Sequence, residues 1–350
     1  MSSTKCAVVI GDGGWGTTLA LLLTRNGVRT TLWSAFPEQA DEMRETRENR
    51  RYLPGVVLPA GLAVTADPFE AAKGCELCFS VVPTQFLRAV AERFEDALPG
   101  DVPVVTATKG IEIETFRTPS EILREVLGDR PFAVVSGPSH AEEVARGLTA
   151  SVVAASKAPD LAKLAQDALS CEAFRVYTHT DPKGAELGGA LKNVIALAAG
   201  IADGLELGDN AKAALVTRGL VEMARFGQMH GARADTFFGL AGLGDLATTC
   251  YSEHSRNRHV GEEIGRGKKL EQVLSEMQMV AEGVWTTKAL YGPEAEARSL
   301  RMPIAEEVHG VLFDGNDPRE SVTRLMTREP QGEMDGLFGD LFRRFEGAPT

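Results

Sequence analysis

A glycine-rich segment near the amino end of the chain constrains the fold more than any other feature of the sequence. G-D-G-G-W-G, residues 11–16, directly follows a short apolar run and precedes an expected helix over 17–26. In this setting Gly11 permits a tight turn, Gly13 lets the backbone approach a pyrophosphate, and Gly16 allows close packing of helix on strand. The helix amino end adds unpaired N–H groups and a positive dipole. The segment therefore predicts a dinucleotide-binding loop, in preference to a plain glycine turn.

Short β-branched runs alternate with helical patterns over the first 180 residues. The runs are apolar throughout, as expected of strands that helices cover on both faces. Four prolines stand where the intervening helices would begin, namely Pro37, Pro68, Pro119 and Pro159. This rhythm predicts an α/β fold, a Rossmann-like doubly wound parallel sheet over residues 1–180. The expected strands are 7–10, 30–33, 77–82, 102–106, 133–136, 151–155 and 174–177.

The pattern changes after residue 180. Residues 188–200 are rich in Ala, Leu and Ile, and helical patterns continue to about residue 326 without a strand pattern. We therefore expect an all-helical substrate-binding and catalytic domain over 181–327. A C-terminal tail over 328–350 would follow, in which 334–345 has the pattern of one amphipathic helix.

Charge and cysteine content exclude several classes of protein. With 49 acidic and 37 basic residues the formal net charge is −12, so we expect no nucleic-acid partner, and any bound anion needs a local cationic site. Neither a signal peptide nor an apolar run of membrane-spanning length is evident, so we expect a cytoplasmic protein without stable membrane insertion. The five cysteines are scattered and odd in number, which suits reduced thiols. Cys75 and Cys78 are interpreted as part of a buried strand, and we expect no metal site.

Two motifs follow expected strands, at the sheet edge where ligands of such folds bind. Lys109 of A-T-K-G can neutralise a phosphate or polarise a carbonyl. The S-G-P-S-H segment can offer a backbone N–H near Gly137 and the Ser139 hydroxyl to a substrate oxygen. For His140 a structural role is favoured over acid or base catalysis.

Lys192 and Asn193 interrupt the apolar stretch 188–200. Burial disfavours the charged form of lysine, which moves its pKa toward the range useful for proton transfer. An ion-paired lysine between the domains is the structural alternative.

Three acidic or basic motifs occur further along the helical half. Asp245 is a carboxylate bracketed by glycines in G-L-G-D-L. Ser255 is expected to cap a helix whose first turn holds Arg256 and Asn257, which would make a phosphate site. Glu282 could bring a carboxylate to a sugar hydroxyl or cap a helix.

The end of the second strand leaves the coenzyme open. It reads W-S-A-F, residues 33–36, with neither the carboxylate that binds a ribose hydroxyl nor an arginine. Because no carboxylate would repel a ribose 2′-phosphate there, NADPH is favoured as the coenzyme, and NADH is kept as an alternative. The nearest arginines are interpreted as a solvated helix face: Arg44, Arg47, Arg50 and Arg51. Asp12 would oppose a pyrophosphate unless its carboxylate points away or caps the turn.

Taken together, six motifs resemble those of the NAD(P)-dependent glycerol-3-phosphate dehydrogenases of bacterial type. In chain order they are G-D-G-G-W-G-T, A-T-K-G, S-G-P-S, L-G-G-A-L-K-N-V-I-A-L-A-A-G, G-L-A-G-L-G-D-L and S-R-N-R, within residues 7–326. The resemblance implies interconversion of dihydroxyacetone phosphate and sn-glycerol 3-phosphate by hydride transfer with NADPH or NADH. The product would feed glycerophospholipid synthesis.

The resemblance also implies roles for individual residues. Lys192 would be the proton donor and acceptor, supported by Lys109, Asn193 and Asp245. The expected cofactor-binding residues are Gly11, Gly13, Gly14, Trp15, Gly16, Ala35, Tyr52, Lys109, Ala141, Arg256, Val280 and Glu282. The expected substrate-binding residues are Lys109, Gly137, Ser139, Lys192, Asp245, Ser255, Arg256 and Asn257. The family often has His or Arg at the position of Ala35 and a neutral residue at that of Asp12, so these departures bear on coenzyme preference.

Two other functions stay open at this point. Another two-domain β-hydroxyacid dehydrogenase would share the glycine loop and a catalytic lysine, but the phosphate site at 255–257 argues against it. A non-catalytic dinucleotide sensor would keep the loop and could lose Lys192, because fold alone does not determine function. A homodimer is an open alternative for the oligomeric state.

Overall fold

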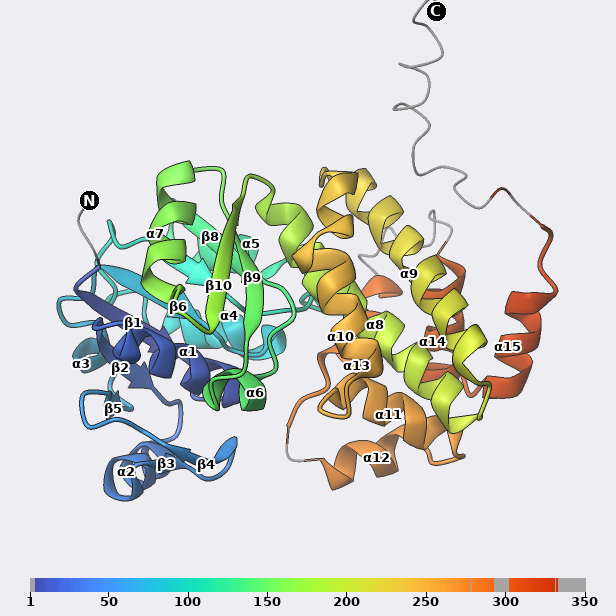
Figure 1. Cartoon of the computed structure of the whole chain (residues 1–350), viewed down its shortest axis with the longest axis horizontal. Coiled ribbons are helices and arrows are strands. Elements are labelled where there is room, and N and C mark those ends of the chain that lie inside the picture. Colours follow the sequence, from blue (N-terminus) through green and yellow to red (C-terminus); the bar gives the residue numbers. More distant parts are fainter. Residues whose placement is uncertain (1–3, 278, 293–301, 331, 333–350) are drawn as a thin grey trace, which may run out of the picture.

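The computed structural model describes residues 4–277, 279–292, 302–330 and 332, and within them it shows two lobes (Figure 1). The first lobe is built on one sheet of eight strands: β1 (Cys6–Ile10), β2 (Arg29–Trp33), β5 (Ala63–Thr65), β6 (Leu77–Ser80), β7 (Val104–Thr106), β8 (Phe132–Ser136), β9 (Ala150–Ala155) and β10 (Phe174–His179). Their order across the sheet is β10-β9-β8-β7-β6-β1-β2-β5. Neighbouring strands are parallel except β8 and β9, which are antiparallel. The prediction of a parallel sheet is thus confirmed for most of the sheet, and the pair of β8 and β9 is the exception.

Both faces of this sheet are buried. Successive residues of β1 belong to different hydrophobic clusters, with Val9 on one face and Val8 on the other. Side chains of the first helix pack on the Val9 face, and side chains of the fourth and fifth helices pack on the Val8 face. The covering helices are α1 (Gly14–Arg25), α2 (Pro37–Thr46), α3 (Pro68–Ala72), α4 (Thr84–Glu92), α5 (Pro119–Leu127), α6 (Ala141–Ala145) and α7 (Pro159–Leu169).

Proline was a dependable sign of helix starts in this lobe. Helices α2, α3, α5 and α7 each begin at one of the four expected prolines. The ring fixes φ near its helical value, and the missing N–H falls where the helix has no partner for one. The seven expected strands are all present, with ends that differ by a few residues.

Several expectations were wrong in detail. Helix α1 begins at Gly14 and not at residue 17, because the helix starts inside the glycine loop. The short β5 and the hairpin of β3 (Glu48–Asn49) and β4 (Leu53–Val57) were not anticipated, since they are short or carry Pro and Gly. The four arginines do not share a helix face. Helix α2 ends at Thr46, and Arg47 takes a left-handed conformation with φ of 53°.

The second lobe is helical, as expected, and the described residues beyond β10 contain no strand. Its helices are α8 (Pro182–Gly204), α9 (Asp209–Met229), α10 (Asp245–Tyr251), α11 (Arg256–Gly265), α12 (Leu270–Glu276), α13 (Glu282–Leu290), α14 (Pro303–Phe313) and α15 (Pro318–Met326). A 3-10 turn η1 (Ala234–Phe238) and a π-helical turn η2 (Leu240–Gly244) lead into α10. The helix expected over 334–345 lies outside the described residues.

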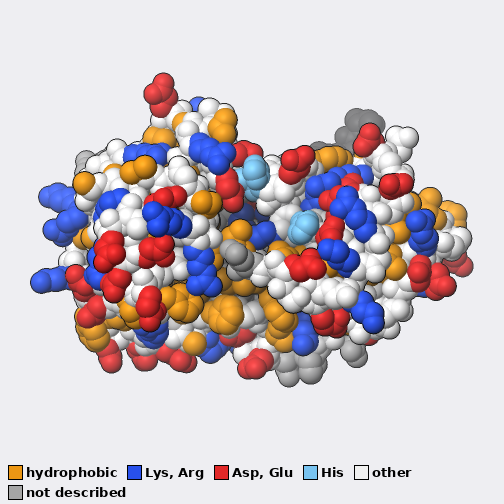
Figure 2. Space-filling view, turned by 90° about the horizontal axis from the view of Figure 1, so that it is seen from below, with side chains coloured by type: hydrophobic (Ala, Val, Ile, Leu, Met, Phe, Trp, Pro, Cys, Tyr) orange, Lys and Arg blue, Asp and Glu red, His pale blue; other side chains and the backbone are white. Residues whose placement is uncertain are grey.

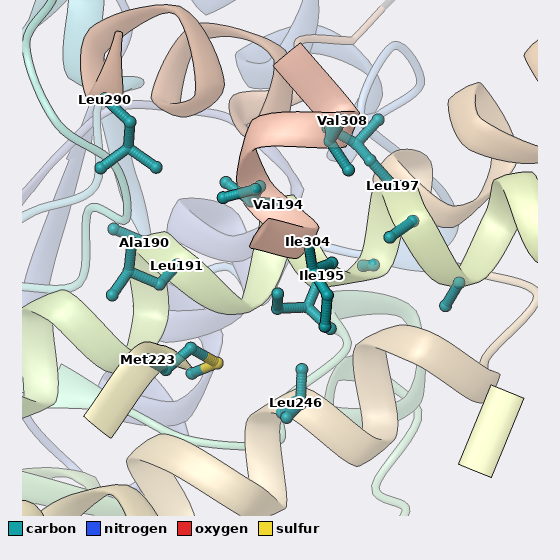
Figure 3. Packing of buried hydrophobic residues seen from close by; sticks show 14 of the residues in the cluster. Ala190, Leu191, Val194, Ile195, Leu197, Met223, Leu246, Leu290, Ile304 and Val308 are labelled. Carbon is teal, nitrogen blue, oxygen red and sulfur yellow. The ribbon is translucent and has the colours of Figure 1, made fainter. Parts of the chain in front are cut away.

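Helix α8 forms the centre of the helical lobe. Every residue from Gly184 to Ala202 is buried, and its apolar side chains meet those of α9, α10, α13 and α14 (Figure 3). Glycines let it approach its neighbours closely: a Cβ at Gly200 would lie 2.0 Å from the Arg258 carbonyl oxygen of α11. Among the described residues, α8 is long and apolar enough to span a membrane, whereas no apolar run of that length was expected from the sequence. However, 94% of its most apolar window is buried inside the protein, as in a core helix.

Candidate active site

The glycine loop has the shape required to hold a pyrophosphate. Gly11 has a φ of 110°, and a Cβ at Gly16 would lie 1.9 Å from the Gly11 carbonyl oxygen, so both positions need glycine. A Cβ at Gly13 would meet no atom within 4 Å, so the space in front of the loop is open. The amino end of α1, with Gly13 as its cap residue, faces this space with unpaired N–H groups. The loop therefore fits a dinucleotide.

Asp12 points away from that space. Its Oδ2 accepts a 2.7 Å hydrogen bond from the Ser34 hydroxyl just beyond β2, and the residue is buried. Its carbonyl oxygen accepts from Thr17 and Asn49. Burial raises the pKa of Asp12, although the Ser34 hydrogen bond lowers it. The carboxylate therefore ties the loop to the end of β2.

The expected cofactor residues near the loop come from distant parts of the chain. A Cβ at Gly14 would lie 2.8 Å from the Tyr52 carbonyl oxygen and 3.5 Å from the Ala141 Cβ. The Thr18 hydroxyl of α1 donates to the Ala141 carbonyl oxygen at 3.2 Å. The fold thus brings Gly14, Tyr52 and Ala141 together. Trp15 is half-buried and packs against Phe174, with ring centroids 6.1 Å apart.

A carboxylate shared by two lysines joins the two lobes. Asp245, the first residue of α10, accepts from Lys109 through Oδ2 and from Lys192 through Oδ1, each at 2.5 Å. Lys109 follows β7 in the sheet lobe, and Lys192 lies midway along α8. Lys109 also donates to the Gly137 carbonyl oxygen at 3.3 Å. Lys192 is thus both buried and ion-paired, but its pair with Asp245 lies within the helical lobe, and Lys109 makes the ion pair between the lobes.

The electrostatics of this cluster favour proton transfer at Lys192. Burial lowers the pKa of Lys192 to about 8; the Asp245 carboxylate acts to raise it and the Lys109 ammonium to lower it. Burial opposes ionisation of Asp245, but the two ammonium groups outweigh it and hold the pKa of Asp245 below its usual value. An anionic Asp245 therefore faces a lysine that can gain or lose a proton near neutral pH.

Two residues beside this cluster, Thr249 and Gly189, were not predicted from the sequence. The Thr249 hydroxyl lies 2.7 Å from the Lys192 Nζ and donates to the Asp245 carbonyl oxygen at 2.6 Å. Thr249 stands four residues after Asp245, so helical spacing could have placed it on the same face. Gly189 was also missed: a Cβ there would lie 3.3 Å from the Lys109 side chain, which passes over it.

The expected contact of Asn193 with Lys192 is not made. The Asn193 carboxamide accepts from the Asn257 Nδ2 at 2.9 Å and donates to the Gly189 carbonyl oxygen at 3.2 Å. Asn257 Oδ1 in turn accepts from the Gly283 N–H at 2.9 Å. Consecutive helical residues point in different directions, so Asn193 faces α11 and α13 while Lys192 faces Asp245. The two asparagines connect three helices.

The expected phosphate site has a capped helix and an available cation. Ser255 caps α11 by accepting from the Arg258 N–H at 3.2 Å, as predicted. Arg256 is exposed and makes no hydrogen bond or ion pair with any residue of the described chain. The carboxylates that act on it electrostatically are those of Glu282 and Glu142.

Glu282 connects the lobes on the other side of the cluster. As the first residue of α13, it accepts from the Thr84 N–H of α4 at 3.0 Å through Oε1. Its Oε2 is buried and has no hydrogen-bond partner in the described chain. A Cβ at Gly110, after β7, would lie 3.0 Å from that oxygen. Burial raises the pKa of Glu282 to about 7. Val280, partly buried, precedes α13.

The turn after β8 lines a cavity of about 260 Å³. Gly137, with φ of 142°, places its carbonyl where both Lys109 and the Ser139 hydroxyl donate to it. His140 Nε2 is buried without a partner among the described residues, and burial lowers the pKa of His140. The lining residues are Pro138, Ser139, His140, Glu143, Thr149, Ala150, Ser151 and Thr248. Figure 2 shows a hollow between the lobes with Lys, Arg and His side chains beside it.

The fold and this site define a two-domain dehydrogenase that uses a nicotinamide dinucleotide. Comparison with known families makes this class more specific. The model for the NAD-dependent glycerol-3-phosphate dehydrogenase N-terminus matches residues 6–162, and that for its C-terminus matches residues 181–323. The chain belongs to this family of NAD-dependent glycerol-3-phosphate dehydrogenases.

Individual relatives are similar along nearly their whole length. The glycerol-3-phosphate dehydrogenase (NAD(P)+) of Pelotomaculum thermopropionicum is 50% identical over 331 residues, which cover 93% of this chain and 94% of that protein. The enzyme of the same name from Geobacter sp. (strain M21) is 48% identical and covers 93% and 98%. The crystal structure of glycerol-3-phosphate dehydrogenase from Coxiella burnetii superposes with a TM-score of 0.88 at 37% identity, covering 93% and 99%.

Proposed function

We propose that the chain catalyses the reversible reduction of dihydroxyacetone phosphate to sn-glycerol 3-phosphate with NADPH or NADH. The observation that carries this proposal is the cluster of Lys109, Asp245 and Lys192, in which Asp245 and Lys192 are buried and which lies where the carboxyl edge of the sheet meets α8. The names of the relatives support the same substrate and coenzyme. The product would supply the glycerol backbone of phospholipids.

The coenzyme would lie along the carboxyl edge of the sheet. The loop of Gly11, Gly13 and Gly16 and the amino end of α1 would hold its pyrophosphate. The unpartnered Glu282 Oε2 would accept a hydrogen bond from a coenzyme hydroxyl. When bound, the reduced nicotinamide supplies the hydride that the C2 carbonyl carbon receives.

Lys192 would carry the proton. In reduction its ammonium donates a proton to the C2 oxygen as the carbonyl becomes a hydroxyl, and in oxidation the neutral amine accepts it. Asp245 and Thr249 hold the Lys192 Nζ in place. The Lys109 ammonium adds positive potential where negative charge develops on oxygen.

The phosphate end of the substrate would bind at α11. Arg256 supplies an available cation, and the helix end capped by Ser255 supplies backbone N–H groups. Asn193 and Asn257 would act as positioning residues, because their carboxamides connect α8, α11 and α13. Gly137 and Ser139 would contact the substrate from the turn after β8.

A substrate comparison tests the proposal. Coenzyme oxidation is measured with dihydroxyacetone phosphate, with dihydroxyacetone and with a panel of non-phosphorylated 2- and 3-keto acids. We expect kcat/KM for dihydroxyacetone phosphate to exceed that for dihydroxyacetone by about 100-fold or more, since each charge-assisted hydrogen bond contributes about 1.5–3 kcal/mol. Faster turnover of a keto acid would favour another β-hydroxyacid dehydrogenase. Coenzyme binding without turnover of any substrate would favour a sensor.

Location and organisation are part of the same proposal. All five cysteines are free, which suits the reducing cytoplasm. We divide the chain into a dinucleotide-binding domain, 1–180, and a catalytic domain, 181–327. A homodimer is the oligomer we would test for, by light scattering.

A further inference from the structure

The end of β2 leaves the ribose side of the coenzyme site without a usable carboxylate. Ser34, Ala35 and Phe36 follow β2, and none can accept a bond from a ribose hydroxyl as an acidic side chain would. Asp12 reaches this point from the glycine loop, but the residue is only 6% exposed and its Oδ2 is bonded to Ser34. A coenzyme without a 2′-phosphate therefore gains no carboxylate contact there.

Arg51 differs from the other arginines of its segment. Arg44 pairs with Asp41, and Arg50 pairs with Glu48 and Glu42. The guanidinium of Arg47 donates to the carbonyl oxygens of Leu58, Pro59 and Leu62. Arg51 is exposed and forms no ion pair with any residue that the structure describes; instead it lies over aromatic rings, 5.7 Å from the centroid of Phe36 and 5.0 Å from that of Tyr52. It is the cation of this segment that remains available to a ligand.

Arg51 lies on a segment that contacts both the residues just beyond β2 and the glycine loop. Phe36 lies three residues beyond β2, where the ribose of a dinucleotide binds in this type of fold. Tyr52, the next residue after Arg51, has its carbonyl oxygen 2.8 Å from the Cβ position of Gly14 in the glycine loop. Arg51 also acts electrostatically on Asp12. Its guanidinium thus lies over Phe36, just beyond β2, on a segment whose next residue contacts the glycine loop.

We propose that Arg51 receives the 2′-phosphate of NADPH and makes NADPH the preferred coenzyme. The Phe36 and Tyr52 rings orient the planar guanidinium, which can form two parallel hydrogen bonds to a phosphate. The cation thus comes from the segment between β3 and β4, in place of one in the loop that follows β2. This inference rests on the proposed use of a nicotinamide dinucleotide and specifies its form.

Binding of two nucleotide fragments tests the assignment without requiring turnover. Titration calorimetry of the full chain compares 2′,5′-ADP with 5′-AMP, which lacks the 2′-phosphate, for the natural protein and for Arg51→Ala. Arg50→Ala is the matched control, because Arg50 neighbours Arg51 but is paired with Glu48 and Glu42. We expect the natural protein and Arg50→Ala to bind 2′,5′-ADP about 10- to 100-fold more tightly than 5′-AMP, and Arg51→Ala to reduce this ratio to within about threefold.

The same variants separate this inference from the proposed reaction. The ratio of kcat/KM for NADPH to that for NADH should fall with the binding ratio in Arg51→Ala, while Arg50→Ala keeps the ratio of the natural protein. A natural protein that does not discriminate between the fragments, or an Arg51→Ala variant that retains the preference, overturns the assignment of Arg51. Loss of preference in Arg51→Ala, together with no turnover of dihydroxyacetone phosphate by the natural protein, would support the 2′-phosphate site and reject the reaction.

Discussion

The Lys192 Nζ lies 2.5 Å from the Asp245 Oδ1, and both side chains are less than 10% exposed. The other carboxylate oxygen of Asp245 is 2.5 Å from the Lys109 Nζ, so one anion faces two cations that come from different lobes. Because the acid and base chemistry depends on this arrangement, variants of Lys192 and Asp245 should change the reaction rate and its pH dependence more than they change folding.

Replacement of Lys192 by alanine should reduce kcat by about 10²–10⁴-fold, the usual contribution of a positioned acid or base. The variant should fold normally, since alanine suits a buried helix and Asp245 keeps its pair with Lys109. Kinetics and circular dichroism check both points. Lys183→Ala on the same helix, whose lysine pairs with Glu121, is the control. Near-normal turnover by Lys192→Ala would refute the assigned role.

The pH dependence should report the ionisation of Lys192. Reduction needs the ammonium, so kcat/KM for dihydroxyacetone phosphate should fall as pH rises through about 8, while the rate of oxidation should rise through the same range. In Asp245→Asn the carboxylate that raises the pKa of Lys192 is lost, so both midpoints should move to lower pH. Rate profiles measured in both directions test this. An unchanged or higher midpoint in the variant would contradict it.

Replacement by alanine should have different effects on stability and coenzyme binding at two glycines of the loop. At Gly13 the new Cβ meets no protein atom, so Tm should be unchanged, but the methyl group enters the expected pyrophosphate space and should weaken coenzyme binding about tenfold or more. At Gly16 the Cβ would meet the Gly11 carbonyl oxygen, so stability should fall by about 3 kcal/mol or more. Thermal unfolding and coenzyme titration distinguish the two. Equal losses of Tm would show that a Cβ at Gly13 does meet protein atoms, and unchanged coenzyme affinity in Gly13→Ala would show that the pyrophosphate does not bind in front of Gly13.

Glu222 should make stability depend on pH. It is buried and accepts hydrogen bonds from the Ile304 and Ala305 N–H groups at the start of α14. Burial raises the pKa of Glu222 from 4.5 to about 7, so the folded state holds the proton more tightly than the unfolded state. Its contribution is therefore fully present below about pH 4.5, and about 3 kcal/mol is lost as pH rises through 7.

Glu222→Gln removes this titration, so Tm of the variant should change less between about pH 5 and pH 8 than that of the natural protein. Glu320→Gln, at an exposed position on α15, serves as the control and should follow the natural protein. If the difference in Tm between the two pH values were the same in Glu222→Gln as in the natural protein, Glu222 would not be the titrating group.

Much of this protein could be predicted from local sequence. The glycine loop, the buried strands, the helix starts at proline and the cap at Ser255 each depend on a few neighbouring residues, and the structure contains all of them. The limits of local signals are also visible. Strand β5 has only three residues, which are too few to show a strand pattern. The antiparallel pairing of β9 with β8 depends on the path of the chain between them.

Which side chains meet could not be predicted from local sequence. Asp245 pairs with Lys109 across 136 residues, Asp12 turns to Ser34, and Asn193 bonds to Asn257 and not to its neighbour Lys192. Among four nearby arginines, the folding of the segment after α2 left Arg51 available. Short stretches of sequence specify the kinds of chemical group and the local helices, strands and turns that carry them. Their partners and pKa values came from the tertiary structure, because burial and charge proximity depend on surfaces that meet only when the whole chain has folded.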